Sequence, residues 1–461
     1  IALYPPPEVG GFTARSDKMS QKMANTDAPM TTTPMTTTHL AGLTRRRLLK
    51  TGIALSAATV TGAKADLTIG GQVISQPSQR YGSNNDADNM AFGEPNAMPN
   101  GNTPMQTFPV TPQWDFATIK ANCEALKGRG VHLHLVAPSG FGSDEQRNLL
   151  AIHRLTQAGF YIDNPEVISR RYLRFAGSDS ERLGDISALL NRPVHELPKI
   201  LLGVRGGYGA MRLLNKLSDQ QWRTLTQKLK DRGTLLMGFS DFTALQLAMY
   251  AKGHLPYVAG AMLSSDFGKT AVNTDTIQSF INLCTQNQLR IQVPETQLYR
   301  DTARPLAKPI KGTLWGGNLS VLSAMVGTPY MPTVDNGILF LEDTGEQPYR
   351  IERMLQTLVL SGIVAKQQAI VLGKFNFSGI SDAYNGDYTF DTVIRTIQQT
   401  TGRPIYTDFP FGHVARRINF PLGVPVTLDN VGSGYQATFN QFYHLKTDAN
   451  FGNLDLTKLF V

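Results

Sequence analysis

The chain is poor in cysteine and has no long hydrophobic run. Only two cysteines, Cys123 and Cys284, occur in 461 residues, which excludes a scaffold held together by disulfides. They lie far apart in helix-like contexts. We therefore expect two unpaired buried thiols, although an oxidising compartment would permit a bridge. No apolar run reaches the roughly 18 residues that span a bilayer, so we expect no membrane span in the mature protein.

The chain also has little net positive charge outside the N-terminal region. The formal net charge is +8, but residues 1–65 hold eight basic and three acidic residues, which leaves 36 basic and 33 acidic residues in the rest. A net charge of +3 without a basic run does not indicate phosphate binding, so we expect no nucleic-acid partner. No cluster of cysteine and histidine suggests a metal site, and we expect neither metal nor cofactor.

The first 113 residues do not have the pattern of a folded domain. The run TRRRLLK at 44–50 precedes a mild apolar stretch that ends near Ala63 and Ala65, an order that resembles a twin-arginine export signal. We interpret 1–65 as such a signal with an atypically long leader, and 66–113, rich in Asn, Gly, Pro and Met, as a low-complexity linker. This predicts a periplasmic protein. The alternative is a short hydrophobic helix that begins a cytoplasmic domain.

From residue 114 onward, apolar strands alternate with helices. Within 114–272, a β-rich run is expected at 131–140, broken by Pro138 and Gly140, with strands at 198–204 and 233–239 and helices at 114–126, 143–159, 181–192, 208–217 and 241–253. This alternation predicts a mainly parallel sheet with helices on both faces. Residues 273–308 are expected to connect this domain to a second one at 309–461, which has fewer helices and β-rich segments at 423–430 and 435–441.

The stretch TLLMGFSDFTAL places Ser240 between a buried strand and a helix. In a parallel sheet this turn lifts the hydroxyl above the carboxyl ends of the strands, with the N–H groups of the next helix unpaired nearby. The pattern is that of a nucleophile elbow, although Phe242 replaces the usual glycine. The alternative is that Ser240 only caps the helix.

Three further stretches also follow apolar strands. The loop GVRGGYGAM at 203–211 allows a close backbone approach to a ligand, but its glycine spacing matches no phosphate-binding motif, and an ordinary tight turn is the alternative. Glu342 ends the strand in GILFLED, and His413 follows a glycine in FPFGH. A carboxylate and a histidine can orient and deprotonate a serine. Alternatively, Glu342 or Glu346 caps a helix or pairs with Arg350 or Arg353, and His413 is a surface residue.

Taken in order, seven stretches between about 130 and 430 resemble the LD-carboxypeptidases, serine peptidases that trim the murein tetrapeptide. They are LVAPSG, LRFAGSDSERLGDISALL, VRGGYGAMRLL, MGFSDFTAL, GTLWGGNLSVL, LFLEDTGEQPYRIERML and FPFGHVARRINFPLG. The resemblance implies an α/β fold with an N-terminal Rossmann-like domain and a smaller C-terminal swivelling β/β/α domain. The family also includes the microcin C self-immunity peptidase.

The resemblance also implies roles for individual residues. Ser240 would be the nucleophile, Glu342 the orienting acid and His413 the general base. The N–H groups of Gly207 and Asp241 would form the oxyanion hole. For the free carboxylate of the substrate we suggest four residues in glycine-rich loops, of which the first could equally form a salt bridge: Arg205, Tyr208, Trp315 and Asn318.

The expected activity is removal of the terminal D-alanine from murein tetrapeptides, in cell-wall turnover or recycling. One departure from the family is that residues 259–262 read AGAM where a His-Gly-Pro-Met run is common, which puts the local packing in doubt. Two alternatives stay open: a microcin-type immunity peptidase that cleaves aminoacyl-nucleotide conjugates, and a periplasmic peptide-binding protein. Members of the family are often homodimers.

Overall fold

The structure is a computed structural model that describes residues 114–300 and 309–461. The signal and linker predicted at 1–113 lie outside the described residues and stay predictions. All described residues belong to one compact unit, Gly82–Val461. Both cysteines are buried and unpaired, as expected. In the described part of the chain, no helix has the length and apolar character to cross a membrane.

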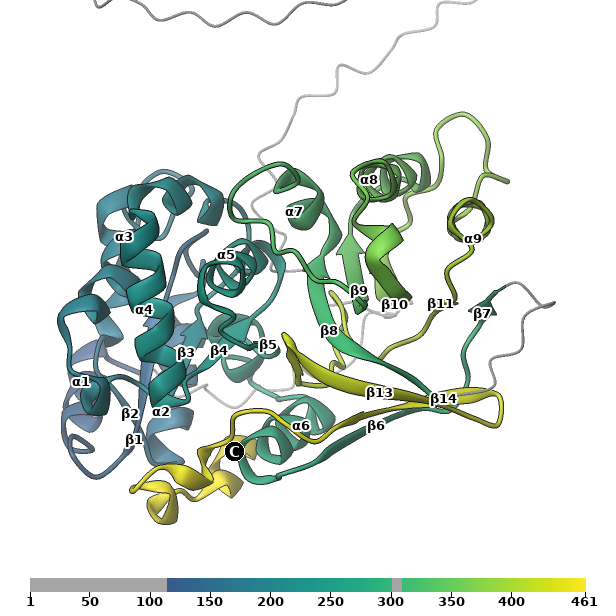
Figure 1. The fold of residues 1–461 in the computed structure, drawn as a ribbon. Helices are drawn as coiled ribbons and strands as arrows, with labels where there is room; N and C mark the ends of the chain where they lie inside the picture. The colour runs from purple at the N-terminus through teal and green to yellow at the C-terminus, as the bar shows by residue number, and fades with distance from the viewer. Residues whose placement is uncertain (1–113, 301–308) are drawn as a thin grey trace, which may run out of the picture. The chain divides into compact units, whose positions relative to one another are not determined.

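The central strands of the first sheet, β1, β3 and β4, are the short apolar runs that the sequence pattern predicts, whereas β2, β5 and β12 were not predicted. The strand order of this sheet is β12-β5-β4-β3-β1-β2, and all neighbours are parallel except β12, which runs antiparallel to β5 (Figure 1). The central strands are almost entirely buried, which explains why they read as continuous apolar runs. The strands are β1 (Val131–Val136), β2 (Phe160–Ile162), β3 (Ile200–Gly203), β4 (Leu235–Gly238), β5 (Tyr257–Ala259) and β12 (Phe420–Leu422).

Side-chain caps and a glycine set the ends of two helices between these strands. The side chain of Asp144 caps α2, and Ser218 forms a capping box with Gln221 at α4, which ends at Gly233 in the left-handed conformation. The helices of the N-terminal half are α1 (Phe116–Glu124), α2 (Glu145–Gln157), α3 (Asp179–Ser187), α4 (Asp219–Arg232), α5 (Thr243–Gly253) and α6 (Thr274–Thr285).

One connection of this half, between β3 and β4, differs from the predicted helices. Residues 208–217 were expected to form an α-helix, but Ala210–Lys216 forms 3₁₀ turns, entered from Gly209 at φ 143° without a side-chain cap. The α-helix on this crossover is α4, whose capping box and buried Trp222, Leu225 and Leu229 follow directly. The predicted helix in this connection was thus placed one segment too early.

The second sheet has eight strands in the order β6-β14-β13-β8-β9-β10-β11-β7. Parallel pairing joins β8 to β9, β9 to β10 and β10 to β11, and the outer strands pair antiparallel. The strands are β6 (Leu289–Val293), β7 (Leu298–Tyr299), β8 (Ile310–Asn318), β9 (Gly337–Thr344), β10 (Gln367–Asn376), β11 (Ile405–Tyr406), β13 (Val424–Val431) and β14 (Gly434–Phe439). The helices are α7 (Leu319–Ala324), α8 (Pro348–Leu360) and α9 (Phe390–Thr401).

The chain crosses between the two sheets in both directions. Residues 273–308, expected to be a connection, contribute α6, and β6 and β7 join the second sheet. In return, β12 forms the edge of the first sheet, and the C-terminal tail contacts the first domain through Asn450, whose amide donates to Gly130 O at 3.0 Å. The Rossmann-like sheet and the two-part α/β architecture are confirmed, while the predicted domain boundaries stay a prediction.

Candidate active site

Ser240 lies on a strained turn between β4 and α5. Its φ is 61°, a left-handed conformation that costs a non-glycine residue free energy and is concentrated at functional sites. The position before α5 is Phe242, which makes no side-chain cap, so Ser240 does not cap that helix. The bulky Phe242 fits because residue 238 is glycine: a Cβ there would lie 2.5 Å from the Phe242 ring. The turn therefore presents Ser240 as a half-buried residue just beyond the carboxyl end of β4.

The glycine loop at 203–211 packs directly against Ser240. A Cβ on Gly206 would lie 2.8 Å from both Cβ and Oγ of Ser240 and 3.7 Å from Asp241 N. Gly207 has φ 107° and is exposed. The loop backbone thus lies beside the hydroxyl and one predicted oxyanion donor. Gly206, one of the three loop glycines expected from the sequence to allow a close backbone approach, makes the closest approach to Ser240.

Replacing Gly206 with alanine should reduce kcat about 10²-fold. Its φ lies outside the left-handed region, so the backbone accepts a side chain, but the new methyl group would push Ser240 aside. A displacement of about 1 Å in a reacting group can cost about this much. Steady-state kinetics would measure the effect. The matched control is Gly184→Ala in α3, where a Cβ meets nothing within 4 Å. Equal activity of both variants would contradict the predicted role of the approach.

The carboxylate of Asp241 connects the Ser240 turn to the loop that contains Ser139 and to the glycine loop. It accepts hydrogen bonds from Ser139 Oγ at 2.6 Å and from Ala210 N at 2.9 Å, and burial raises its pKa above the ordinary value. The buried guanidinium of Arg182 donates to the carbonyl oxygens of Pro138 and Gly209 in the same loops. These contacts fix the glycine loop against the elbow.

Glu342 and His413 form a direct pair. Glu342 Oε2 lies 2.7 Å from His413 Nδ1, and the Glu342 side chain is 1% exposed while that of His413 is 22% exposed. The carboxylate holds the proton on Nδ1, which leaves Nε2 free to accept one. The alternative that Glu342 pairs with Arg350 is wrong, because Glu346 is the partner of Arg350, at 3.6 Å.

An aromatic contact connects this pair to the serine turn. The ring of Phe239, which precedes Ser240, lies 5.1 Å from the His413 ring and 5.6 Å from that of Phe411, centre to centre. In the described residues, no hydrogen bond joins Ser240 to His413. Catalytic hydrogen bonds are often long before substrate binds, so this arrangement is compatible with a triad.

Asn318 forms hydrogen bonds with Glu342 and with its neighbour Asp343. Asn318 Nδ2 lies 3.2 Å from both Glu342 Oε1 and Asp343 Oδ1, and its backbone N–H donates to Thr243 Oγ1 in α5. Asp343 also accepts from the N–H of Ser320 at 2.8 Å and from its hydroxyl at 2.7 Å. One asparagine therefore links the helix behind Ser240 to the strand that carries Glu342.

Stability should depend on pH through Asp343. Burial, and then the charge of Glu342, raise its pKa from 3.8 to about 6. A raised folded-state pKa stabilises the protein below the unfolded value and loses that contribution as the pH rises through 6. Relative to Asp343→Asn, the wild type should lose about 2 kcal/mol of unfolding free energy between pH 4 and 7. Urea unfolding of both proteins across this range measures the difference, and parallel curves would contradict it.

The four residues suggested for substrate contact differ in their exposure to solvent. Tyr208 is 47% exposed on the glycine loop, and Arg205 is half-buried there. Trp315 is buried and donates from Nε1 to Gln367 Oε1 at 2.8 Å, and Asn318 is buried between the two carboxylates. These positions speak against direct substrate contact for Trp315 and Asn318. For Arg205 and Tyr208 the role stays a prediction.

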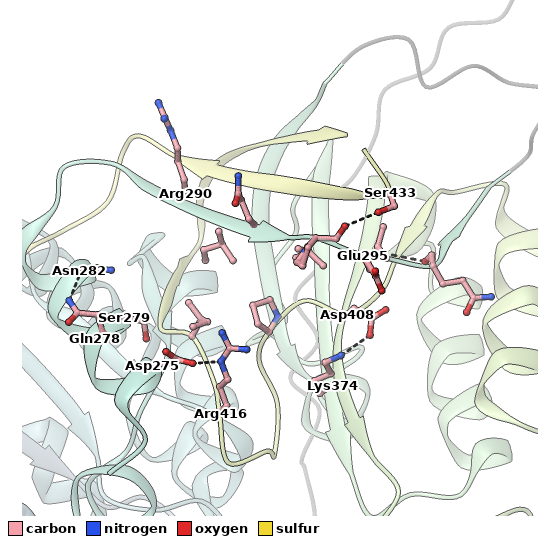
Figure 2. A pocket seen from close by; sticks show the side chains of 18 residues that line it. Asp275, Gln278, Ser279, Asn282, Arg290, Glu295, Lys374, Asp408, Arg416 and Ser433 are labelled. Atoms are coloured by element: carbon pink, nitrogen blue, oxygen red, sulfur yellow. Dashed lines mark hydrogen bonds and ion pairs between the residues drawn. The ribbon is translucent and has the colours of Figure 1, made fainter. Parts of the chain in front are cut away.

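A cavity of about 1100 Å³ is lined in part by Pro410, Arg416 and Ile418, which belong to the loop that carries His413. Figure 2 shows two ion pairs at its wall: Arg416 with Asp275 at 2.5 Å, and Lys374 with Asp408 at 2.7 Å. None of Ser240, Glu342 and His413 lines it. Across 114–300 and 309–461, no group of three or more potential metal-ligating side chains is placed to hold an ion.

A serine on a strained strand-to-helix turn, next to a carboxylate–histidine pair, is typical of hydrolases with α/β folds. Comparison of the sequence with models of known protein families identifies the kind of hydrolase. Residues 133–260 match the N-terminal domain of LD-carboxypeptidases, and residues 311–428 match their C-terminal domain. The chain belongs to the LD-carboxypeptidase family of peptidases.

Individual relatives agree with this membership. A putative carboxypeptidase of Streptomyces coelicolor is 31% identical over 310 residues, which cover 65% of this chain and 91% of the relative. A probable murein peptide carboxypeptidase of Bacillus subtilis is 25% identical, covering 65% and 89%. The crystal structure of a muramoyltetrapeptide carboxypeptidase from Oxalobacter formigenes matches with a TM-score of 0.57 and 31% identity, covering 68% and 99%. The microcin C7 self-immunity protein has the same fold, with a TM-score of 0.56 at 22% identity, covering 68% and 97%.

Proposed function

We propose that the protein is a serine LD-carboxypeptidase that removes the terminal D-alanine from murein tetrapeptides. The hydrogen bond between Glu342 and His413, beside a serine held on a strained elbow, is the observation that carries the proposal. The names of the murein and muramoyltetrapeptide relatives support this substrate class. The run TRRRLLK supports a periplasmic location, where the enzyme would meet peptidoglycan directly.

The mechanism follows from the roles that each group can take. Ser240 Oγ attacks the carbonyl carbon of the bond before the terminal alanine, and His413 Nε2 takes its proton. Glu342 stays ionised and stabilises the imidazolium that forms. The N–H groups of Gly207 and Asp241 stabilise the negative oxygen, and each such donor is typically worth about 10²–10³ in turnover. His413 then protonates the leaving amine, and water releases the acyl group by the same steps in reverse.

Product analysis tests this proposal. The full chain is incubated with a muramyl tetrapeptide, and mass spectrometry follows the loss of one alanine, with Ser240→Ala as the control. An aminoacyl-nucleotide conjugate is tested in parallel, because one relative is the microcin C7 self-immunity protein of Escherichia coli, 29% identical over 218 residues, which cover 42% of this chain and 62% of the relative. A strong preference for the conjugate would overturn the murein proposal, and reversible peptide binding without product would favour a binding protein.

A further inference from the structure

A small hairpin at residues 171–174 projects from the first domain with four exposed side chains in a row. Tyr172 and Phe175 close it with two backbone hydrogen bonds of 2.9 Å, and Leu173 at its tip has φ 52°. Tyr172 is 55% exposed and Leu173 78% exposed. The exposed side chains of Tyr172 and Leu173 do not contribute to the core. Exposed apolar side chains and residues with a strained backbone are both concentrated at binding sites.

The hairpin is connected to the Ser240 turn by backbone contacts. Phe175 forms a β-bridge with Gly140, whose N–H donates to Gly206 O at 3.1 Å. Gly206 is the residue that packs against Ser240. From the same glycine loop, the exposed ring of Tyr208 lies 5.7 Å below Arg174 Cζ. The hairpin and Tyr208 therefore form one surface, which is connected to the Ser240 turn through the glycine loop.

Two arginines on the hairpin hold positive charge at this surface. The guanidinium of Arg171 lies 4.8 Å from the ring centre of Phe141, and Arg174 stacks on Tyr208 in the same way. No carboxylate in the described parts of the chain pairs with either of them. The neighbouring arginines differ: Arg170 pairs with Asp185 at 2.8 Å, and Arg212 with Asp179 at 2.9 Å. An aromatic ring under a guanidinium leaves its N–H groups available for a ligand.

We propose that this surface, Arg171–Arg174 with Tyr208, binds the carboxylates of the peptide stem that precedes the scissile bond. The proposal rests on the proposed function. The terminal alanine is a single residue beyond the reacting carbonyl and must lie near Ser240. The hairpin lies beyond the glycine loop and reaches a more distant part of the substrate. A stem glutamate linked through its side chain keeps a free α-carboxylate, and the planar arginine fork binds a carboxylate with two parallel hydrogen bonds.

The test compares Arg171→Gln/Arg174→Gln with wild type on two tetrapeptides that differ only in amidation of the glutamate α-carboxylate. We expect the KM for the acidic peptide to rise about five- to tenfold in the variant, with kcat unchanged. The KM for the amidated peptide should be nearly the same in both proteins. Added salt should raise the wild-type KM for the acidic peptide more than that of the variant. The control is Arg223→Gln, an exposed arginine of α4.

Each other outcome has a definite meaning. An unchanged KM for the acidic peptide, with active wild type, would overturn the hairpin proposal and leave the proposed function standing. A loss of kcat on both peptides alike would assign the hairpin a structural role only and would also overturn it. The nucleotide conjugate is assayed with both proteins as well. If the double variant had a raised KM for the conjugate but not for the acidic peptide, the ligand of this surface would be a phosphate and the carboxylate proposal would be overturned. If wild type releases alanine from neither peptide, the proposed function fails and this inference fails with it. Both side chains are exposed, so we expect the thermal unfolding midpoint to be unchanged.

Discussion

Ser240→Ala should lower kcat for alanine release by about 10⁴-fold or more, and adding His413→Ala should cost almost nothing further. The two side chains act as one unit, because the imidazole is useful only when a hydroxyl is present to give up its proton. Single and combined losses of such groups are then nearly equal. The residual rate would come from the loop N–H groups at Gly207 and Asp241 and from substrate binding. Single-turnover kinetics on the muramyl tetrapeptide would measure all three variants.

The control for this experiment is His195→Ala, since the side chain of His195 is 81% exposed on a separate turn. It should leave kcat unchanged. A fluorophosphonate probe should label wild type and His195→Ala but not Ser240→Ala. If the double variant were 10²-fold or more below Ser240→Ala, the histidine would act independently of the serine. The proposed division of roles would then be wrong.

The sequence was sufficient to predict the three central strands of the first sheet, for a physical reason. Strands β1, β3 and β4 are buried on both faces, so they appear as short apolar runs bounded by glycine and polar residues. The same pattern placed Ser240 beyond the carboxyl end of β4. Glu342 and His413 were candidates from their places at a strand end and in a loop, but their roles beside Ser240 were implied by the family resemblance, because the two lie 71 residues apart and no periodicity relates them.

Other features depend on tertiary packing that a single sequence does not reveal. Trp315 and Asn318 flank two glycines and were suggested from that glycine-rich context, but β8 is an inner strand of the second sheet, which buries both. The approach of Gly206 to Ser240 is a distance between two loops. The pairing of β12 with β5 joins segments more than 160 residues apart. The exposure of Tyr172 and Leu173 is likewise a property of the folded surface, because the residues alone would fit a buried strand equally well.

Glu342→Gln should reduce kcat about 10⁴-fold although the two side chains have almost the same shape. Asn318 Nδ2 donates to Glu342 Oε1, so the glutamine must turn its carbonyl oxygen towards Asn318. Its NH₂ group then faces His413 Nδ1, where the carboxylate oxygen had been at 2.7 Å. Nδ1 becomes the acceptor, and the proton moves to Nε2. The tautomer that can take a proton from Ser240 is lost, and a change of this kind costs about 10⁴ in a serine protease triad.

Two further measurements distinguish this tautomer effect from damage to the fold. The unfolding free energy of Glu342→Gln should not fall by as much as that of Glu342→Ala, because the buried amide still accepts a hydrogen bond from Asn318. The KM should change little, since the carboxylate contacts the imidazole and not the substrate. Glu196→Gln, on an exposed turn, is the matched control with unchanged kcat. A Glu342→Gln variant that kept more than a tenth of wild-type kcat would show that the carboxylate does not set the histidine tautomer, and the proposed role of Glu342 would have to be abandoned.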